Sequence, residues 1–304
     1  MVTAKEISYP MRKKAFLLRK YAWAYLLLLP SFAFLMTFSY YPVFSAFYHA
    51  FTDWNLSEAN WVGFDNFVRF FQDQIILTSF QNQAIVTVFD LVKALFFPLL
   101  AAELVHMLPG PRSKYFFRTG FILPFLVPGI VGLMLWKSIY DPISGLLNQL
   151  LAIAGLEHLQ HAWLGDQDTA LGAVIAIGFP FITGLNFLLF YAALDNMNQE
   201  IVDASRIDGA SGWMVFRYIH IPLLVPLIKV LIVLTIIGSL QNYGQFLILT
   251  SGGPGTSTMV PALTMFISAF NSSEYGYACA IGTVLFFIII VLSLFNMKIV
   301  KSRV

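Results

Sequence analysis

The chain has 304 residues, of which 58% are hydrophobic and only 11% are charged, whereas about a quarter of the residues in a soluble domain are charged. This composition excludes an ordinary soluble domain and indicates an integral membrane protein. The formal net charge of +2 is too small to indicate nucleic-acid binding, and the one cysteine, Cys279, excludes an internal disulfide and a cysteine-based metal cluster.

The N-terminal residues predict a cytoplasmic segment followed by a membrane span. Residues 1–20 hold six Lys and Arg residues and one acid, whereas residues 21–41 carry no charge. Such an uncharged run is long enough to cross the roughly 30 Å of membrane hydrocarbon. It is also longer than a signal-peptide core and has no small-x-small cleavage site after it. We therefore expect an uncleaved first span over about residues 21–50.

A short surface helix is expected next. Residues 61–71 are amphipathic and place Asp65 and Arg69 at i, i+4, where opposite charges attract on one helix face. This pattern favours a helix that lies on the outer surface of the membrane.

The second span, over about residues 84–107, contains three charged residues. Charges inside a membrane are costly unless they are paired or face protein. Asp90 and Lys93 are three residues apart and can neutralise each other on one helix face. We interpret them as a structural pair facing other helices, with a transport role as the alternative. Glu103 falls near the inner end of the span, where we expect water to be close.

The rest of the chain predicts four more spans. They are separated by a basic loop at 109–114, an outer connection at 141–166, a polar interval at 198–222 and a Gly- and Pro-containing break that begins at Ser251. The predicted fold is an all-α polytopic membrane protein, with a transmembrane domain over 21–297 and six spans at about 21–50, 84–107, 115–139, 169–194, 222–250 and 275–297.

The basic residues predict the orientation. Of the 18 Lys and Arg residues, 14 lie on the side that holds both termini and the 198–222 interval. Because cytoplasmic loops are enriched in Lys and Arg, we expect residues 1–20, the interval 198–222 and the tail 298–304 to be cytoplasmic.

The interval 198–222, between spans 4 and 5, predicts two short helices. Asn198 can cap the first helix and Gly209 can end it, while Ser211 can cap the second. On the first helix Ala204 and Ser205 leave one side nearly bare, so that another backbone can approach closely. We therefore expect this loop to dock against a partner.

The same residues resemble a known family. Asp203-Ala-Ser, then Gly209 after three residues and Ile219-His-Ile-Pro222 after nine more, is similar to the "EAA" loop of bacterial ABC-transporter permeases. Asp203, Ser205 and Ile221 depart conservatively from that pattern. The segment from Asp203 to Trp213, and the turn Leu249-Thr-Ser-Gly-Gly-Pro, resemble the permeases of carbohydrate importers. The resemblance covers about residues 20–297.

The resemblance implies a function and a set of partners. The chain would be the permease subunit of a binding-protein-dependent importer for a carbohydrate, with an oligosaccharide as the expected solute, in a bacterial cell membrane. It would work by alternating access with a second permease subunit in a heterodimer, two ATPase subunits that hold ATP and Mg, and an extracytoplasmic solute-binding protein. No cofactor is expected on this chain. The implied ATPase-coupling residues are Asp203, Ala204, Ser205, Arg206, Asp208, Gly209, Ala210, Trp213, Phe216 and Pro222.

The fifth span carries the candidate substrate pathway. Gln241, Asn242, Tyr243 and Gln245 place amides and an aromatic ring about halfway to two-thirds across an apolar helix, and such groups suit a sugar. Hydrogen bonding between helices is an equal alternative. On a continuous helix Gln241 and Gln245 would share one face.

Other chemistry has little support in the sequence. His158 and His161 have no third histidine nearby in sequence, so a solvated helix face is favoured over a metal site. The turn that begins at Ser251 lacks the Lys of a phosphate-binding loop, and no nucleophile elbow or His-Glu-x-x-His motif occurs. Enzyme activity is therefore not expected.

Two alternatives stay open. One is a permease of the same superfamily for a glycerophosphate or another polar solute, which would require basic residues in the pathway, where only Lys93 is found. The other is a self-sufficient secondary transporter or a membrane enzyme. The absence of catalytic motifs and of an inverted repeat argues against this second alternative.

Overall fold

The structure, a computed structural model, describes residues 11–299, and all regular elements in this part of the chain are helical. The one extended feature among them is an isolated bridge between Thr52 and Trp61. The all-helical prediction is confirmed for the described residues. The α-helices are α1 Met11–Leu35, α2 Tyr41–His49, α3 Asp65–Gln72, α4 Gln74–Met107, α5 Pro111–Ile122, α6 Gly129–Ile139, α7 Leu146–Ile153, α8 Gln167–Ala176, α9 Gly184–Asp195, α10 Gln199–Ile207, α11 Gly212–Val215, α12 Ile221–Gln241, α13 Gly244–Leu249, α14 Pro261–Phe270 and α15 Tyr275–Ile299. Short π-helical segments (η1 Met36–Tyr40, η4 Phe216–His220) and 3-10 segments (η2 Leu123–Leu126, η3 Glu157–Leu159) join some of them.

Four helical segments within residues 11–299 are long and apolar enough to cross a membrane, and a fifth results if one bent pair of helices is counted as a span. That pair, Pro111–Leu126 with Gly129–Ile139, bends by 90°. The prediction of several spans is therefore confirmed, whereas the number six stays a prediction. The four segments are Ala24–His49, Gln74–Met107, Gly212–Gln241 and Tyr275–Lys298.

The predicted fourth span is not one helix. Residues 177–183 are non-helical and separate α8 from the short apolar helix α9. Gly178 has a φ of +88° and Phe181 a φ of +64°. Pro180, between them, lacks the amide hydrogen that a helix interior requires. An uncharged run thus contains a local break that hydropathy does not show.

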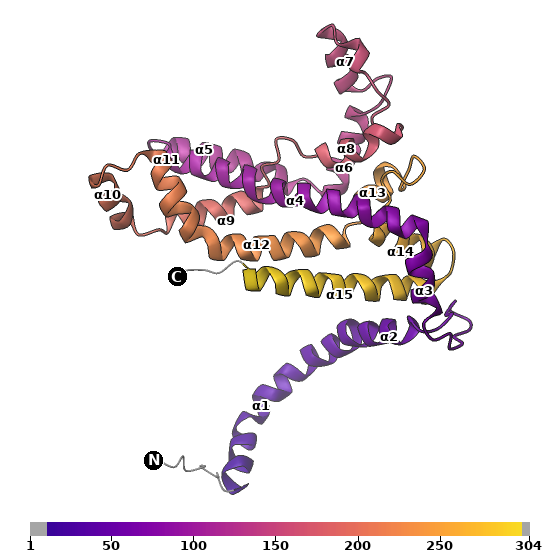
Figure 1. The fold of residues 1–304 in the computed structure, drawn as a ribbon. Coiled ribbons are helices and arrows are strands. Elements are labelled where there is room, and N and C mark those ends of the chain that lie inside the picture. Colours follow the sequence, from indigo (N-terminus) through magenta and orange to yellow (C-terminus); the bar gives the residue numbers. More distant parts are fainter. Residues whose placement is uncertain (1–10, 300–304) are drawn as a thin grey trace.

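The second span begins earlier than the sequence predicts. α4 starts at Gln74 because the Asp73 side chain caps it, accepting hydrogen bonds from the amides of Ile75 (2.8 Å) and Ile76 (3.4 Å). The resulting helix of 34 residues is the longest in the described chain. It therefore runs along the whole bundle (Figure 1).

α4 lies at the centre of the packing. Phe187 and Phe190 of α9 and Leu224 of α12 are fully or almost fully buried in one cluster with α4. Ala101 and Ala102 supply the α4 side of this cluster, and such small residues allow helices to approach closely. α1, by contrast, curves away from the other helices (Figure 1), and residues 24–44 are all exposed.

The helix α3 is held by an ion pair that the sequence did not predict. Arg69 of α3 makes a bidentate contact with Glu274, at 2.9 and 2.8 Å, rather than with Asp65 of its own helix. The hydrogen bond to the Glu274 carboxylate raises the pKa of Arg69 above its ordinary value. The i, i+4 spacing pointed to Asp65, but the ion-pair partner of Arg69 is the carboxylate of Glu274 in a distant segment.

Candidate functional site

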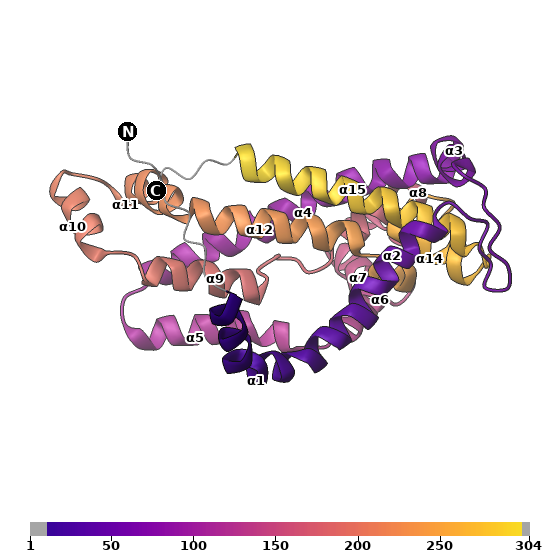
Figure 2. The same ribbon diagram turned by 90° about the horizontal axis from the view of Figure 1, so that it is seen from below.

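The loop between α9 and α12 projects beyond one end of the bundle, and both views place α10 outside the packed helices (Figures 1 and 2). Its local geometry agrees with the sequence. The Asn198 side chain accepts a hydrogen bond from the Glu200 amide at 2.9 Å, and Ser211 accepts one from the Met214 amide at 3.4 Å. Gly209 has a φ of +85°, which is the conformation that ends a helix at glycine.

The surface of α10 has few partners within the described chain. Ile207 is 87% exposed and Trp213, after the bend, is 69% exposed. Asp203 and Arg206 are also exposed and lie 3.9 Å apart, a distance that gives a weak contact. A Cβ placed on Gly209 would meet no atom within 4 Å. Glycine is therefore favoured at position 209 by the positive φ and not by close packing, and the described chain leaves the space beside Gly209 unfilled.

The second half of the loop belongs to the next span. α11, η4 and α12 form one continuous segment, Gly212–Gln241, so Phe216 and Pro222 lie within a single helical unit. The five residues Phe216–His220 form a π-helical turn, a feature often found at functional sites. Only residues 208–211 separate α10 from this long helical segment.

A buried polar pair lies at this π-helical turn. His220 Nδ1 is 2.9 Å from both carboxylate oxygens of Glu103 on α4, and the two residues are only 4% and 3% exposed. The expectation that Glu103 lies close to water is wrong. The sequence separation of 117 residues hid this partner from sequence reasoning.

The predicted fifth span is interrupted at its polar residues. α12 ends at Gln241, and α13 begins at Gly244. Asn242 has an extended backbone, with φ −80° and ψ 108°. The prediction that Gln241 and Gln245 share a face of one continuous helix is therefore wrong, because the helix axis is broken between them.

This break and the 177–183 break line the same pocket. The pocket has a volume of about 310 Å³ and takes its walls from α4, the 177–183 segment and the last turns of α12. Its walls are mostly apolar with a few polar side chains, as in many ligand sites. Its lining residues are Asp90, Lys93, Ala94, Ile177, Gly178, Phe181, Thr183, Thr235, Gly238, Ser239 and Asn242.

The two charges in the pocket are paired. Lys93 Nζ lies 2.8 Å from Asp90 Oδ1, and the other Asp90 oxygen accepts a hydrogen bond from Ser239 at 2.8 Å. Lys93 also donates a hydrogen bond to the carbonyl of Ile175 at 3.2 Å, and the Gln83 side chain donates one to the carbonyl of Ser239. The predicted Asp90–Lys93 pair is confirmed. The pocket consequently presents no net charge from this pair.

The structure separates the four predicted pathway residues. Asn242 lines the pocket, whereas the Tyr243 ring stacks on Phe266 with centroids 5.0 Å apart and packs against an apolar core. Gln241 is exposed and Gln245 half-buried, and neither lines this pocket. Sequence reasoning missed Thr235 and Ser239. Their spacing of four residues, on the face that ends at the helix break, is the signal that could have found them.

Within residues 11–299 no cluster of His, Cys, Asp and Glu could hold a metal ion. His161 lies 3.9 Å from Asp166 on the outer connection, and both side chains are partly exposed.

Several long apolar helices place the chain in the class of helical membrane proteins. The model of one family, the binding-protein-dependent transport system inner membrane component, matches residues 94–304. The chain belongs to this family.

Relatives support the same assignment. The chain is 34% identical to the probable ABC transporter permease protein YurN of Bacillus subtilis over 91% of this chain and 96% of the relative. It is 32% identical to the diacetylchitobiose uptake system permease protein NgcF of Streptomyces coelicolor, over 80% of this chain and 72% of the relative. A bacterial ABC transporter chain, from a system involved in import of the acidic polysaccharide alginate, has the same fold. Its TM-score is 0.85 at 21% identity, over 96% of this chain and 99% of that chain.

Proposed function

We propose that this chain is the permease subunit of an ABC importer for a neutral carbohydrate, most suitably an oligosaccharide. The observation that carries this proposal is the pocket of about 310 Å³ where the two helix breaks meet. Its hydroxyl and amide groups can bond sugar hydroxyls, and Phe181 supplies a ring for the apolar face of a sugar. Relatives named for diacetylchitobiose, multiple-sugar and starch-product transport support this substrate class.

A glycerophosphate is the weaker candidate. A relative that is 31% identical is the sn-glycerol-3-phosphate permease UgpA of Escherichia coli. An anionic solute needs a cation that is free to pair with it. Lys93 is already paired with Asp90 at 2.8 Å and donates to Ile175. This pairing favours a neutral solute.

The projecting loop is the proposed coupling element. We place its exposed surface, from Asp203 to Phe216, against an ATPase subunit in the cytoplasm, in line with the basic residues at this end. This chain would bind no nucleotide. ATP and Mg would be held by two partner ATPases, with a second permease subunit and an extracytoplasmic binding protein completing the importer.

The proposed mechanism is alternating access. Closure of the ATPase pair would push α10, and the continuous segment Gly212–Gln241 would carry that motion to the pocket. The pocket would then open alternately to the binding protein and to the cytoplasm.

The test is ATP-dependent uptake by the reconstituted importer, measured with a panel of neutral oligosaccharides and with a glycerophosphate. Asn242→Ala should lower uptake about two- to twelvefold, the loss expected for one hydrogen bond. Gln241→Ala and Gln245→Ala report whether the exposed side of the break also takes part. Thr78→Ala is the control, because Thr78 donates only to Gln74 of its own helix. Uptake of the glycerophosphate in preference to every sugar would refute the substrate class.

The Tyr243 variants are judged by the amount of folded protein as well as by uptake. Because its ring packs on Phe266, Tyr243→Ala should reduce the amount of folded protein, while Tyr243→Phe should leave it unchanged. If all four alanine variants depress every solute equally, the four residues are structural and the pathway lies elsewhere.

A further inference from the structure

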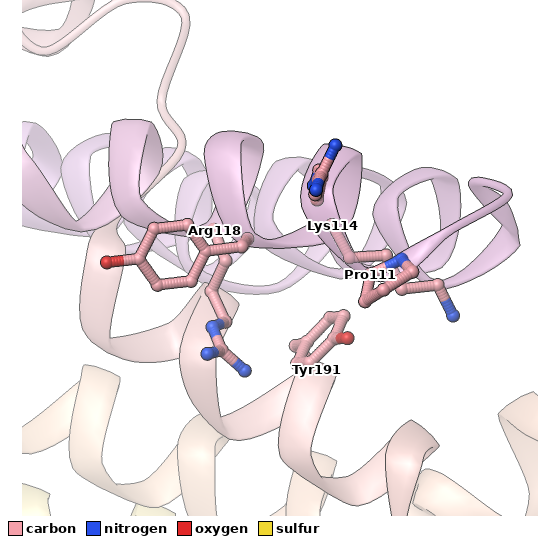
Figure 3. Close-up of a pocket in the computed structure, with 6 residues that line it drawn as sticks. Pro111, Lys114, Arg118 and Tyr191 are labelled. Carbon is pink, nitrogen blue, oxygen red and sulfur yellow. The ribbon is translucent and has the colours of Figure 1, made fainter.

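A basic cavity lies outside the proposed solute pocket. It has a volume of about 480 Å³ and lies between α5 and α9 (Figure 3). Three cationic side chains line it, together with one proline and two tyrosines. The lining residues are Pro111, Arg112, Lys114, Tyr115, Arg118 and Tyr191.

The polar groups of this basic pocket lack partners. Within residues 11–299 none of Arg112, Lys114 and Arg118 forms an ion pair with a carboxylate. Tyr191 is only 5% exposed, yet its hydroxyl makes no hydrogen bond to the described chain. The Tyr191 hydroxyl at the wall of this cationic pocket is therefore free to donate to an acceptor from outside the chain.

The geometry brings these groups together. Figure 3 shows the Tyr191 ring between Arg118 and Pro111, with Lys114 on the α5 side. The Arg118 guanidinium carbon lies 5.8 Å from the centre of the Tyr191 ring. Cations and a hydroxyl donor around one hollow match the oxygens of a phosphate group.

The apolar surfaces next to the basic pocket favour a phospholipid over a free phosphate ion as the ligand. Tyr115 and Phe116 on α5 are 63% and 71% exposed, so an apolar surface adjoins the cations. A second hollow, of about 300 Å³ and lined almost wholly by apolar side chains, lies between α4 and α5 beside Leu104 and Phe117. A ligand with a phosphate headgroup and hydrocarbon chains satisfies both surfaces.

We propose that the basic pocket binds the phosphate headgroup of an anionic phospholipid of the cytoplasmic leaflet. Basic pockets between membrane helices on this side suit such headgroups. Tyr191 lies on α9, whose last residue, Asp195, is followed within a few residues by α10. A bound lipid would therefore tie α5 to the helix that leads into the proposed coupling loop, a consequence that rests on the proposed function.

The test measures lipid binding to the purified importer complex by native mass spectrometry, with phosphatidylglycerol and phosphatidylcholine as probes. The wild-type complex should retain phosphatidylglycerol preferentially. Arg118→Gln should weaken it about fivefold, the effect of one cation near an anionic surface. Tyr191→Phe should weaken it several-fold while every charge stays in place. Lys298→Gln is the matched control, because it removes a cation at the same end of the bundle but outside the pocket.

Five results would overturn the proposal. Equal retention of the two lipids, or equal weakening by Lys298→Gln and Arg118→Gln, would show only diffuse attraction to the basic end of the bundle. Displacement of the lipid by millimolar inorganic phosphate would assign the pocket to a free anion. Lipid binding by the isolated permease subunits but not by the complete importer would assign the pocket to a contact with the ATPase subunits. If Arg118→Gln fails to insert, Tyr191→Phe decides, and unchanged binding in that variant refutes the site. None of these results bears on solute uptake by the Asn242 variant, so the proposed function is tested separately.

Discussion

The buried pair of Glu103 and His220 should hold the loop-bearing helix to α4. It joins the π-helical turn at the start of the Gly212–Gln241 segment to the inner end of α4, with both Nδ1–oxygen distances at 2.9 Å. Glu103→Ala removes the partner of a buried polar group and should destabilise the permease by about 3–5 kcal/mol. Glu103→Gln keeps an oxygen that can accept from His220 and should cost only about 1–3 kcal/mol.

A double-mutant cycle measures this interaction directly. Glu103→Gln, His220→Gln and the double variant are compared by the free energy of unfolding in mixed micelles, with a denaturing detergent. The double variant should cost less than the sum of the single variants, by about 0.5–3 kcal/mol, because either change alone already breaks the contact. In proteoliposomes the same variants should transport less solute for each ATP hydrolysed.

His106 provides the control for this cycle. Its ring lies 6.0 Å from the His220 ring, and its Nδ1 has no hydrogen-bond partner in the described chain. His106→Gln should therefore change the free energy of unfolding less than His220→Gln does. Strict additivity in the double variant, or an equal cost for both histidine variants, would refute the claim that the Glu103–His220 contact links the two helices.

Three further outcomes follow from the loop and from the outer surface. Gly209→Ala should cost about 1 kcal/mol through its φ of +85°; Gly209→Trp should in addition abolish solute-stimulated ATPase activity, and equal ATPase activity in the two variants would count against docking at this face. Asp203→Ala should weaken assembly with the ATPase more than Asp203→Glu does, as seen in co-purification, and equal damage would show that shape rather than charge matters. Arg69→Ala should lower stability by at most about 1 kcal/mol and by less at high salt, because the Arg69–Glu274 pair is partly exposed; a loss that is independent of salt in thermal unfolding would contradict this.

Local rules predicted the local features of this chain. The caps at Asn198 and Ser211 and the turn at Gly209 depend on side chains within three residues of the backbone groups that they serve. The Asp90–Lys93 pair needs only the repeat of the helix on which both residues lie. Such features could be predicted from the sequence because each is complete within one or two turns.

Contacts between distant segments could not be predicted in this way. Glu103 meets His220 across 117 residues, and Asp90 meets Ser239 across 149. Looking for partners three or four residues away on the same helix finds neither His220 nor Ser239. The pocket was missed for the same reason, since its walls come from three separate parts of the chain.

The broken helices were missed for a different reason. Hydropathy measures transfer into the membrane, and both 169–194 and 222–250 are apolar enough to pass this test. Gly178, Pro180 and Gly244 weaken the helix without changing its apolar character. Non-helical backbone within a membrane is stable only where it is buried in protein or lines a cavity. Glycine and proline close together inside an apolar run therefore predict a helix break that lines a cavity.

Polar contacts at two levels between α4 and the Gly212–Gln241 segment have a mechanical consequence. Glu103 and Asp90 are 13 positions apart on α4, which is about 20 Å at 1.5 Å per residue. Each holds a residue of the same neighbouring helix, His220 at the loop end and Ser239 at the pocket. Two helices joined at two such distant levels resist sliding past each other, so they should move as one unit when α10 is displaced. The other pocket wall, residues 177–183, belongs to a non-helical segment that neither contact fixes. A push on the loop would then change the pocket by moving the α4 and α12 side against that wall, and the 177–183 segment is where the change in shape must be taken up.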